Sequence, residues 1–226
     1  MTKVEILRRV PLLTELPEDD LQLICNLASV QKYRRGDIIF FEEDPGDALH
    51  VVISGIVRIY RLADDGREKT LAYVTSGEFF GEMALLDGGA RSAVAEALEP
   101  TETLVIYGSD FTGVLANHPR ISLEIIKVLC RRLRQTNAQL MNIIFRDARN
   151  RVISSLLELA TNYGSPSGSR TRIDLKLTHQ EMANLVGTAR ETISRILAEL
   201  QDEGLLHLDE KRMIVVDTRR LRTLLE

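Results

Sequence analysis

An acid and a base stand out in the segment FGEMALLDGGARSAVAEA, which covers residues 80–97. Glu82 and Arg91 lie nine positions apart, on either side of a short apolar patch from Met83 to Leu86 and a turn with two glycines. A carboxylate can accept hydrogen bonds from hydroxyl groups, whereas a guanidinium forms charge-assisted hydrogen bonds with a phosphate. The spacing therefore suggests a ligand that carries hydroxyl groups at one end and a phosphate at the other.

Positions next to this pair add hydrogen-bond donors. Gly81 lacks a side chain, so the backbone before Glu82 can approach a ligand closely. Ser92 follows Arg91 and offers a hydroxyl group, and the N–H groups at the start of a helical turn over residues 82–86 favour an anion. The alternative is a structural ion pair between Glu82 and Arg91 in a domain that binds no ligand.

A second candidate site lies in residues 177–206, LTHQEMANLVGTARETISRILAELQDEGLL. Thr178 is predicted to cap a first helix, and Glu181, three residues later, completes a capping box. Gly187 suits the tight turn after that helix, and Thr188 is predicted to cap a second one. Two helices joined by a glycine turn and followed by a β-hairpin predict a winged helix-turn-helix.

The second helix opens with side chains that can contact DNA. Arg190 offers two parallel donors to guanine, and Glu191 can accept from the amino group of cytosine. Other polar residues suit phosphate contacts, which orient a protein on DNA without reading its sequence. The alternative is a solvent-exposed helix start without a partner. The candidate DNA-contacting residues are Thr178, Gln180, Ala189, Arg190, Glu191, Thr192, Ser194 and Arg195.

The acid–base segment lies within a region whose pattern favours β-strands. Residues 3–9 and 17–30 are predicted to form short helices, and from residue 31 to about 108 short β-prone runs alternate with turn signals. Many short strands at close, regular spacing suggest a compact antiparallel barrel or roll. The predicted strands are 38–41, 50–53, 56–60, 70–74, 94–97 and 102–106.

A long helix is predicted to follow this region. A short helix over 109–117 precedes Pro119, after which helical spacing continues to about residue 146. One stripe of residues steps by alternating threes and fours, which is the pattern of a coiled-coil seam and suggests a two-fold dimer. The alternative is a helix that packs on its own barrel. The seam positions are Leu123, Ile126, Cys130, Leu133, Asn137, Leu140 and Ile144.

The segment from residue 147 onward is predicted to be a separate unit. It begins with a helix over 148–162 and continues with a loop of small residues over 164–172. The two helices of the helix-turn-helix follow, and then a hairpin with strands over 205–208 and 213–216. The second of those helices is predicted to bury Ile193, Ile196, Leu197 and Leu200.

Composition narrows the classes of protein to which the chain can belong. A chain of 226 residues, of which 44% are hydrophobic, is long enough for one large or two small domains and apolar enough to fold. It has no run of 18 apolar residues and no signal-peptide pattern, so we expect a cytoplasmic protein without a membrane partner. The net charge of −4 does not exclude DNA binding, because a DNA-binding face is local.

The sequence carries no constellation typical of an enzyme or a metal site. Cys25 and Cys130 are far apart, and both are predicted to be buried structural thiols. The segment that begins at His179 lacks the second histidine of a zinc-peptidase helix, and no nucleophile–base pair is found. We therefore expect a binding protein that is not an enzyme and holds no metal.

The two candidate sites together resemble a known family. The stretch FGEMALLDGGARSA resembles the phosphate-binding cassette of cyclic-nucleotide-binding domains, and RETISR resembles the recognition helix of cAMP-responsive regulators. Taken in order, the whole chain resembles the CRP/FNR superfamily of transcription regulators, closest to its cAMP-responsive branch. The resemblance implies an α+β fold with a jelly-roll-like β-roll domain over 1–118, a long dimerisation helix over 119–146 and a winged helix-turn-helix DNA-binding domain over 147–226.

The resemblance also implies cAMP as an allosteric ligand. Glu82 would accept from the ribose 2′-OH, and Arg91 would pair with the cyclic phosphate. Thr136 would contact the adenine from its own subunit, Asn137 would reach it from the partner subunit, and Arg132 would close on the ribose. The implied ligand-binding residues are Gly81, Glu82, Met83, Ala84, Arg91, Ser92, Ala93, Arg132, Thr136 and Asn137.

The implied function is that of a homodimeric, cAMP-dependent regulator of transcription. It would bind double-stranded DNA at palindromes of the TGTGA-N6-TCACA type, with a hinge at residues 145–147 and a loop over 164–172 that contacts RNA polymerase. Alternatives are a cGMP-responsive or ligand-independent regulator of the same family, and a cyclic-nucleotide-sensing module for another protein. The iron–sulfur and haem branches fit less well, because the chain has no N-terminal cysteine cluster and neither His50 nor His118 has supporting context.

Overall fold

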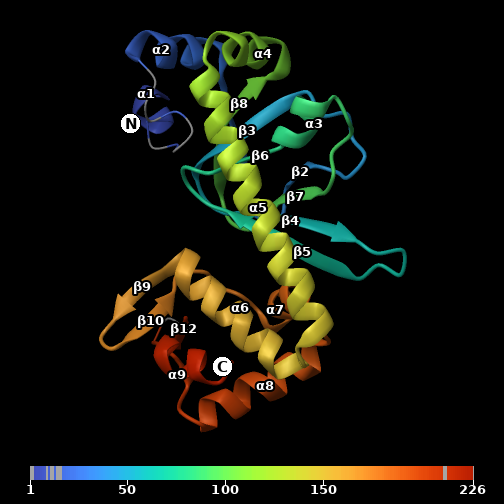
Figure 1. Cartoon of the computed structure of the whole chain (residues 1–226), viewed down its shortest axis with the longest axis vertical. Coiled ribbons are helices and arrows are strands. Elements are labelled where there is room, and N and C mark those ends of the chain that lie inside the picture. Colours follow the sequence, from blue (N-terminus) through green and yellow to red (C-terminus); the bar gives the residue numbers. More distant parts are fainter. Residues whose placement is uncertain (1–2, 9, 11–12, 14–16, 211–212, 226) are drawn as a thin grey trace. The chain divides into compact units, whose positions relative to one another are not determined.

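The computed structural model describes residues 3–8, 10, 13, 17–210 and 213–225 (Figure 1). Its internal contacts divide the chain between Arg132 and Leu133 into an N-terminal unit and a C-terminal unit. Among the described residues, no helix combines the length and the apolar character that crossing a bilayer requires.

Two four-stranded antiparallel sheets form the centre of the N-terminal unit. One sheet has the strand order β1-β8-β3-β6 and the other has the order β2-β7-β4-β5, which confirms the predicted β-roll. The elements of this unit, in chain order, are α1 (Lys3–Leu7), α2 (Glu18–Leu27), β1 (Ser29–Tyr33), β2 (Ile38–Phe40), β3 (Ala48–Ser54), β4 (Val57–Leu62), β5 (Glu68–Val74), β6 (Phe79–Phe80), α3 (Glu82–Asp87), β7 (Val94–Ala97), β8 (Thr101–Tyr107) and α4 (Gly108–Asn117).

Two of these strands are absent from the prediction made on the sequence. The helix predicted over 17–30 ends at Leu27, because Ala28 takes an extended conformation and the next five residues pair with β8 as strand β1. Strand β6 has two residues, which pair with β3. A strand of that length gives no alternating pattern in the sequence.

Apolar side chains join the two sheets and hold the helices that flank them. Leu21 and Ile24 of α2 are buried in one cluster with Leu104 of β8 and Phe111 of α4. A smaller cluster, which brings together strands of both sheets, consists of Val52, Val57, Val74, Phe80 and Ala95. Burial of this apolar surface stabilises the roll and fixes β6, which leads directly into the segment that carries Glu82.

Helix α5 (Pro119–Phe145) begins on the N-terminal unit and continues past its boundary. Ile121 and Ile125 are buried in the core of the N-terminal unit, so one face of the helix packs on its own domain. The predicted seam lies on another face, which stays exposed in the single chain and for which the dimer remains a prediction. Its exposed residues are Leu123, Ile126, Cys130, Leu133, Asn137, Leu140 and Ile144.

The two cysteines differ in their surroundings. Cys25 is buried in the core, as predicted, but the prediction of a buried Cys130 is wrong for the single chain. Cys130 lies on α5 five residues after Ile125 and therefore faces away from the core that holds Ile125.

The C-terminal unit consists of helices and one four-stranded antiparallel sheet with the order β11-β12-β10-β9. Its core contains buried residues of three helices, among them Ile153, Leu156, Met182, Ile196 and Leu200. The elements that follow α5 are α6 (Ala148–Tyr163), β9 (Gly164–Ser167), β10 (Arg170–Ile173), α7 (His179–Val186), α8 (Arg190–Asp202), β11 (Leu206–Leu208), β12 (Ile214–Val216) and α9 (Thr218–Thr223).

The loop predicted over 164–172 is a β-hairpin instead. Its turn contains Gly168, whose φ of +61° lies in the left-handed region. Ile173 at the end of β10 is fully buried, and β10 also pairs with β12, which comes more than 40 residues later. Pairing with a distant strand overrides the weak strand propensity of a segment rich in Ser, Gly and Pro.

Helices α7 and α8 form the predicted helix-turn-helix. Thr178 and Glu181 make the predicted capping box, and Gly187 takes a left-handed conformation with φ of +75°. The prediction that Thr188 caps α8 is wrong, because the N-cap is the next residue, Ala189, which makes no side-chain cap hydrogen bond. The N–H of Thr188 donates to the carbonyl of Ala183 and completes the end of α7. The predicted buried face of α8 is confirmed: Ile193, Ile196, Leu197 and Leu200.

Candidate ligand-binding and DNA-binding sites

The backbone turns sharply where β6 meets α3. Gly81 has a φ of +81°, a conformation that residues with a side chain rarely adopt. A Cβ atom at this position would lie 2.6 Å from Nη1 of Arg91. Glycine at position 81 therefore allows the turn and leaves room for the guanidinium.

Arg91 is buried with little compensation for its charge. Its Nη1 donates to the carbonyl oxygen of Gly81 at 2.8 Å, while its buried Nε has no hydrogen-bond partner among the described residues. The guanidinium carbon lies 4.2 Å from the centre of the Phe40 ring. Burial lowers the pKa of Arg91 and outweighs the opposing attraction of nearby carboxylates, of which Asp47 is the strongest. A buried cation with an unused donor is a suitable partner for an anion.

Glu82 has a cationic partner, but that partner is Arg132 and not Arg91. Nη1 of Arg132 donates to Oε1 of Glu82 at 2.5 Å, and its Nη2 donates to the carbonyl oxygen of Phe79. The Glu82 side chain is buried. The structural alternative considered for the sequence, an ion pair between Glu82 and Arg91, does not form in the described part of the chain.

Two residues near Arg91 are not among the predicted site residues. A Cβ atom at Gly46 would lie 2.1 Å from that of Ala84, so only glycine lets this loop pass beside α3. Phe40 lies on β2, about 50 residues before Arg91, and stacks on its guanidinium. The turn signal at Gly46 was visible in the sequence, but nothing there linked Phe40 to Arg91.

His50 completes an aromatic cluster beside the same guanidinium. Its ring lies 5.0 Å from that of Phe80 in a stacked arrangement and 5.9 Å from that of Phe40. Burial, and secondarily the charge of Arg91, lower the pKa of His50 to about 3. The imidazole is therefore neutral at physiological pH and adds no second positive charge to the site.

The other predicted residues of the segment divide between core and surface. Ala84 and Ala93 are buried, whereas Met83 is half exposed. Ser92 is exposed, and its hydroxyl group lies 3.6 Å from the sulfur atom of Met83. The structure thus brings together the residues of the segment and Arg132 within the N-terminal unit.

Thr136 and Asn137 belong to the part of α5 that lies in the C-terminal unit. Both are exposed, about one helical turn after Arg132. Their contact with a ligand stays a prediction.

The predicted DNA-contacting residues lie at the start of α7 and in the first two turns of α8. Arg190 and Glu191 in its first turn are exposed. The hydroxyl group of Ser194 lies 2.7 Å from Nδ1 of His179, and Arg195 pairs with Glu199 at 2.6 Å. The first turn of α8 is therefore open to solvent, whereas Arg195 already has an intramolecular partner.

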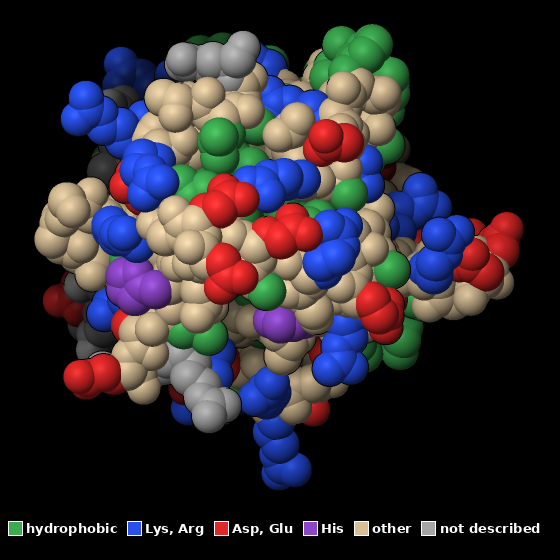
Figure 2. Space-filling model, turned by 90° about the horizontal axis from the view of Figure 1, so that it is seen from below, with side chains coloured by type: hydrophobic (Ala, Val, Ile, Leu, Met, Phe, Trp, Pro, Cys, Tyr) green, Lys and Arg blue, Asp and Glu red, His purple; other side chains and the backbone are tan. Residues whose placement is uncertain are grey.

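The remaining predicted residues have structural roles as well. The hydroxyl group of Thr178 accepts from the backbone of Glu181, and the amide of Gln180 donates to Asn184. Thr192 is half-buried. The face of the molecule in Figure 2, the lower side in Figure 1, shows Lys and Arg side chains next to Asp and Glu side chains. DNA binding on such a face depends on the arrangement of the arginines, since it is not uniformly positive.

Comparison with known proteins assigns each of the two parts of the chain to a known domain family. The profile of the cyclic nucleotide-binding domain matches residues 30–118, and the profile of the Crp-like helix-turn-helix domain matches residues 150–224. These are the parts that contain the β-roll with Arg91 and the helix-turn-helix with Arg195. The two domains define a class of protein: a DNA-binding transcription regulator with a cyclic-nucleotide-binding domain.

Within that class, the chain belongs to the CRP/FNR family of transcription regulators. It is 34% identical over 217 residues to the CRP-like cAMP-activated global transcriptional regulator of Mycobacterium tuberculosis, which covers 96% of this chain and 97% of that protein. It is 38% identical over 198 residues to the cyclic AMP receptor protein of Thermus thermophilus, with 88% of each chain covered. The solved structure of a CooA mutant from Carboxydothermus hydrogenoformans matches with a TM-score of 0.80 at 25% identity, covering 96% of this chain and 95% of that one.

Proposed function

We propose that this regulator binds cAMP and that cAMP binding controls its affinity for DNA. The observation that carries the proposal is the state of Arg91, a buried guanidinium that has, among the described residues, one unsatisfied N–H and no carboxylate within ion-pair distance. Leaving a buried donor unsatisfied costs about 1–3 kcal/mol, so an anion that accepts from it is favoured. The cyclic phosphate of cAMP supplies such an anion.

The ribose would lie between the phosphate, which pairs with Arg91, and the carboxylate of Glu82. The 2′-OH of the ribose donates to Glu82, whose carboxylate is held in place by Arg132. A hydrogen bond from a neutral hydroxyl group to a carboxylate is stronger than one between neutral groups. We place adenine against Thr136 and, from the partner subunit, Asn137, because their hydroxyl and amide groups can pair with the polar edge of the base.

The proposed regulator is a homodimer. The exposed apolar stripe of α5 is long enough for three heptads and would be covered by the same stripe of a second copy. Asn137 on this stripe would then lie where ligand and dimer axis meet. Because cAMP would touch both helices, its binding favours one packing of the two.

The signal would reach the DNA-binding domain through residues 145–147. The helix breaks here: Asp147 is extended and its side chain accepts from the backbone of Asn150 as the N-cap of α6. A helix end with a new cap is a point at which φ and ψ can change while both helices persist. In functional terms the chain would comprise a ligand domain over 1–118, a dimerisation helix over 119–146 and a DNA-binding domain over 147–226.

The proposed target is double-stranded DNA with a palindrome of the TGTGA-N6-TCACA type. We place the regulator in the cytoplasm. Arg190, Glu191 and Arg195 would read the half-site in the major groove, and two copies of α8 would contact half-sites one helical turn apart. The β9–β10 hairpin is a candidate contact for RNA polymerase.

The ligand assignment is tested by calorimetric titration with cAMP and with cGMP. We expect cAMP to bind, and the Arg91→Leu variant to lose binding because the phosphate loses its cation. Arg67→Leu is the matched control, since Arg67 is an exposed arginine of the same unit. Circular dichroism checks that the Arg91→Leu variant is folded. If it is not, the Arg91→Lys variant, which keeps the positive charge, is measured instead. Unchanged affinity in the folded Arg91→Leu variant contradicts the assignment.

The regulatory claim is tested by gel shifts of a palindromic duplex with and without cAMP. We expect tight binding only with cAMP. Equal affinity in both conditions would remove the ligand switch but leave DNA binding intact.

A further inference from the structure

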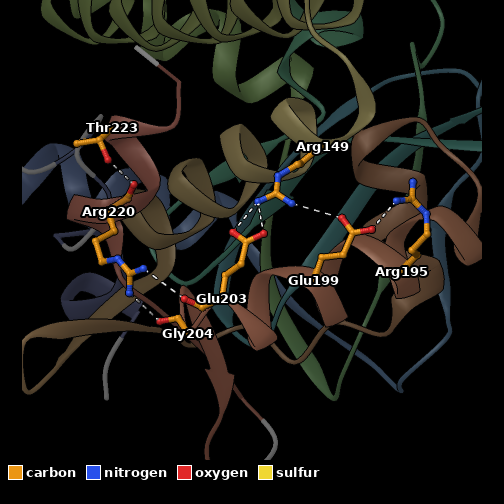
Figure 3. Close-up of polar contacts among 7 residues, drawn as sticks. All are labelled: Arg149, Arg195, Glu199, Glu203, Gly204, Arg220 and Thr223. Carbon is orange, nitrogen blue, oxygen red and sulfur yellow. Dashed lines mark hydrogen bonds and ion pairs between the residues drawn. The ribbon is translucent and has the colours of Figure 1, made fainter.

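Arg195, one of the three residues proposed to read the half-site, has a side-chain partner one helical turn further along α8. Its Nη1 donates to Oε1 of Glu199 at 2.6 Å (Figure 3). An arginine has five N–H donors, and a bidentate contact with guanine uses only two of them. The ion pair therefore leaves one edge of the Arg195 guanidinium available to a base.

Glu199 is itself held from the opposite side. Nη1 of Arg149, on the first turn of α6, lies 3.4 Å from Oε2 of Glu199. Arg149 is anchored more strongly by Glu203, since its Nη2 lies 2.8 Å and 2.7 Å from the two carboxylate oxygens. Figure 3 shows Glu199 between Arg149 and Arg195, with each arginine directed at a different oxygen.

The end of α8 that carries this network is fixed by a further arginine. Arg220 of α9 donates to the backbone carbonyl oxygens of Glu203 and Gly204, at 3.3 Å and 3.4 Å (Figure 3). The carbonyl groups at the end of a helix have no partner within the helix, so these contacts stabilise the last turn. Glu199 is thus attached to a part of the unit that is held by both α6 and α9.

We propose that Glu199 is a positioning residue for DNA recognition, which, held by Arg149, orients the Arg195 guanidinium so that its free edge meets a base of the half-site. An arginine side chain loses rotamer entropy when it is fixed, and part of that loss is already incurred before DNA binds. The inference rests on the proposed role of Arg195 in reading DNA. It assigns Glu199 and Arg149 to that recognition, although neither touches the DNA.

The direction in which the loss of Glu199 changes discrimination between half-sites distinguishes this proposal from the opposite one, in which Glu199 keeps Arg195 away from DNA. A carboxylate near DNA repels phosphates, so the loss of the Glu199 charge raises affinity for all sequences. If Glu199 positions Arg195, its loss also reduces discrimination between half-sites. If Glu199 instead sequesters Arg195, its loss improves specific binding at least as much as nonspecific binding.

The experiment uses the full-length protein with saturating cAMP. The probe is the duplex that the wild-type protein selects from a randomised pool, together with duplexes changed symmetrically at one half-site position each. Fluorescence anisotropy measures the Kd for each duplex. The discrimination ratio is the Kd for a changed duplex divided by the Kd for the selected duplex. The variant is Glu199→Gln, and the matched control is Asp202→Asn, which removes one negative charge from an exposed position of the same helix.

We expect Glu199→Gln to reduce the discrimination ratio about tenfold at the positions where Arg195→Ala reduces it. Asp202→Asn should leave the ratio unchanged. In the Arg195→Ala background, Glu199→Gln should not change the discrimination ratio further, because the residue that Glu199 positions is gone. An unchanged or increased ratio in Glu199→Gln, or effects that add in the double variant, overturns the proposal.

Failure of the inference and failure of the DNA-reading assignment have different signatures. If Arg195→Ala changes discrimination at no position, Arg195 does not read the half-site, and both assignments are wrong. If Arg195→Ala changes discrimination but Glu199→Gln does not, the DNA-reading assignment holds and the positioning role alone is wrong.

Discussion

At the scale of single residues, Arg91 and Glu82 of the proposed ligand site differ in the partners of their side chains. Glu82 has an arginine partner, whereas Arg91 has a backbone carbonyl and the face of an aromatic ring. The types and spacing of these two residues were enough to find them in the sequence. Phe40 was not found, because its contact with Arg91 depends on strand pairing across about 50 residues.

Removal of the Phe40 ring should weaken ligand binding. Phe40→Leu keeps an apolar side chain but loses the cation–π contact, worth about 0.5–2 kcal/mol, so we expect the Kd for cAMP to rise about fivefold. Titration calorimetry measures the change. Phe41→Leu is the matched control, since Phe41 is the next residue and is exposed, and it should bind as the wild type does. Equal affinities in the two variants would contradict a role for Phe40 in holding Arg91.

The buried His50 makes the stability of the fold depend on pH. Its pKa is lowered to about 3 in the folded chain, against about 6.5 when unfolded, so below pH 6.5 the unfolded chain binds a proton that the folded chain excludes. Stability contributed by the neutral imidazole is therefore present above pH 6.5 and is lost as the pH falls toward 3. At pH 5 the loss is about 2 kcal/mol.

Urea denaturation followed by circular dichroism at pH 7.5 and pH 5 checks this expectation. The His50→Gln variant should lose about 2 kcal/mol less than the wild type between the two values of pH. A His50→Gln variant with the wild-type pH dependence would show that His50 is protonated in the fold.

At the scale of helices and strands, the elements that were predicted correctly are those whose sequence pattern is long or depends only on neighbouring residues. The long helix α5 and the capping box of α7 were predicted because periodicity and capping are local. Strand β6 and the β9–β10 hairpin were missed, because two residues give no period and the hairpin depends on pairing with β12. Thr188 was misassigned as a cap because the turn after α7 takes one residue more than expected.

The close approach of α3 to the loop before β3 predicts a sensitive position at Gly46. Gly46→Ala places a methyl group 2.1 Å from the Cβ of Ala84 and within 3.3 Å of the Arg91 side chain, so α3 or the guanidinium must move. We expect the affinity for cAMP to fall at least about fivefold, as overpacking costs about 1–3 kcal/mol. The measurement is the Kd for cAMP in the folded variant.

The matched control for this position is Gly113→Ala in α4, where an added methyl group has no neighbour within 4 Å. It should bind cAMP as the wild type does. Wild-type affinity in Gly46→Ala would mean that α3 can shift without disturbing the site.

At the scale of the whole molecule, the exposed apolar face of α5 determines the expected assembly. Leu133 and Leu140 lie one heptad apart on this face, and each is more than half exposed in the single chain. Two leucines at seam positions are typical of residues that a second helix covers. The sequence was sufficient to predict the stripe, but only the structure shows that Ile121 and Ile125 belong to a different face.

Charges on this face should separate the subunits. The double variant Leu133→Asp and Leu140→Asp places like charges opposite each other at a seam, so we expect a monomer at micromolar concentration and loss of DNA binding. Sedimentation velocity measures the mass. Gln135→Asp, at an exposed position off the stripe, is the control and should stay dimeric. A dimeric double variant would place the subunit contact elsewhere.

The contrast between the two thiols offers a practical route to that interface. Cys25 is enclosed by the core, whereas Cys130 is open to solvent only while the seam face is unpaired, so a maleimide reagent should modify the separated chain at Cys130 and react slowly with the dimer. The rate of modification would therefore report the fraction of chains whose seam is uncovered. On the natural sequence, it could then follow how nucleotide and DNA shift the balance between one copy and two.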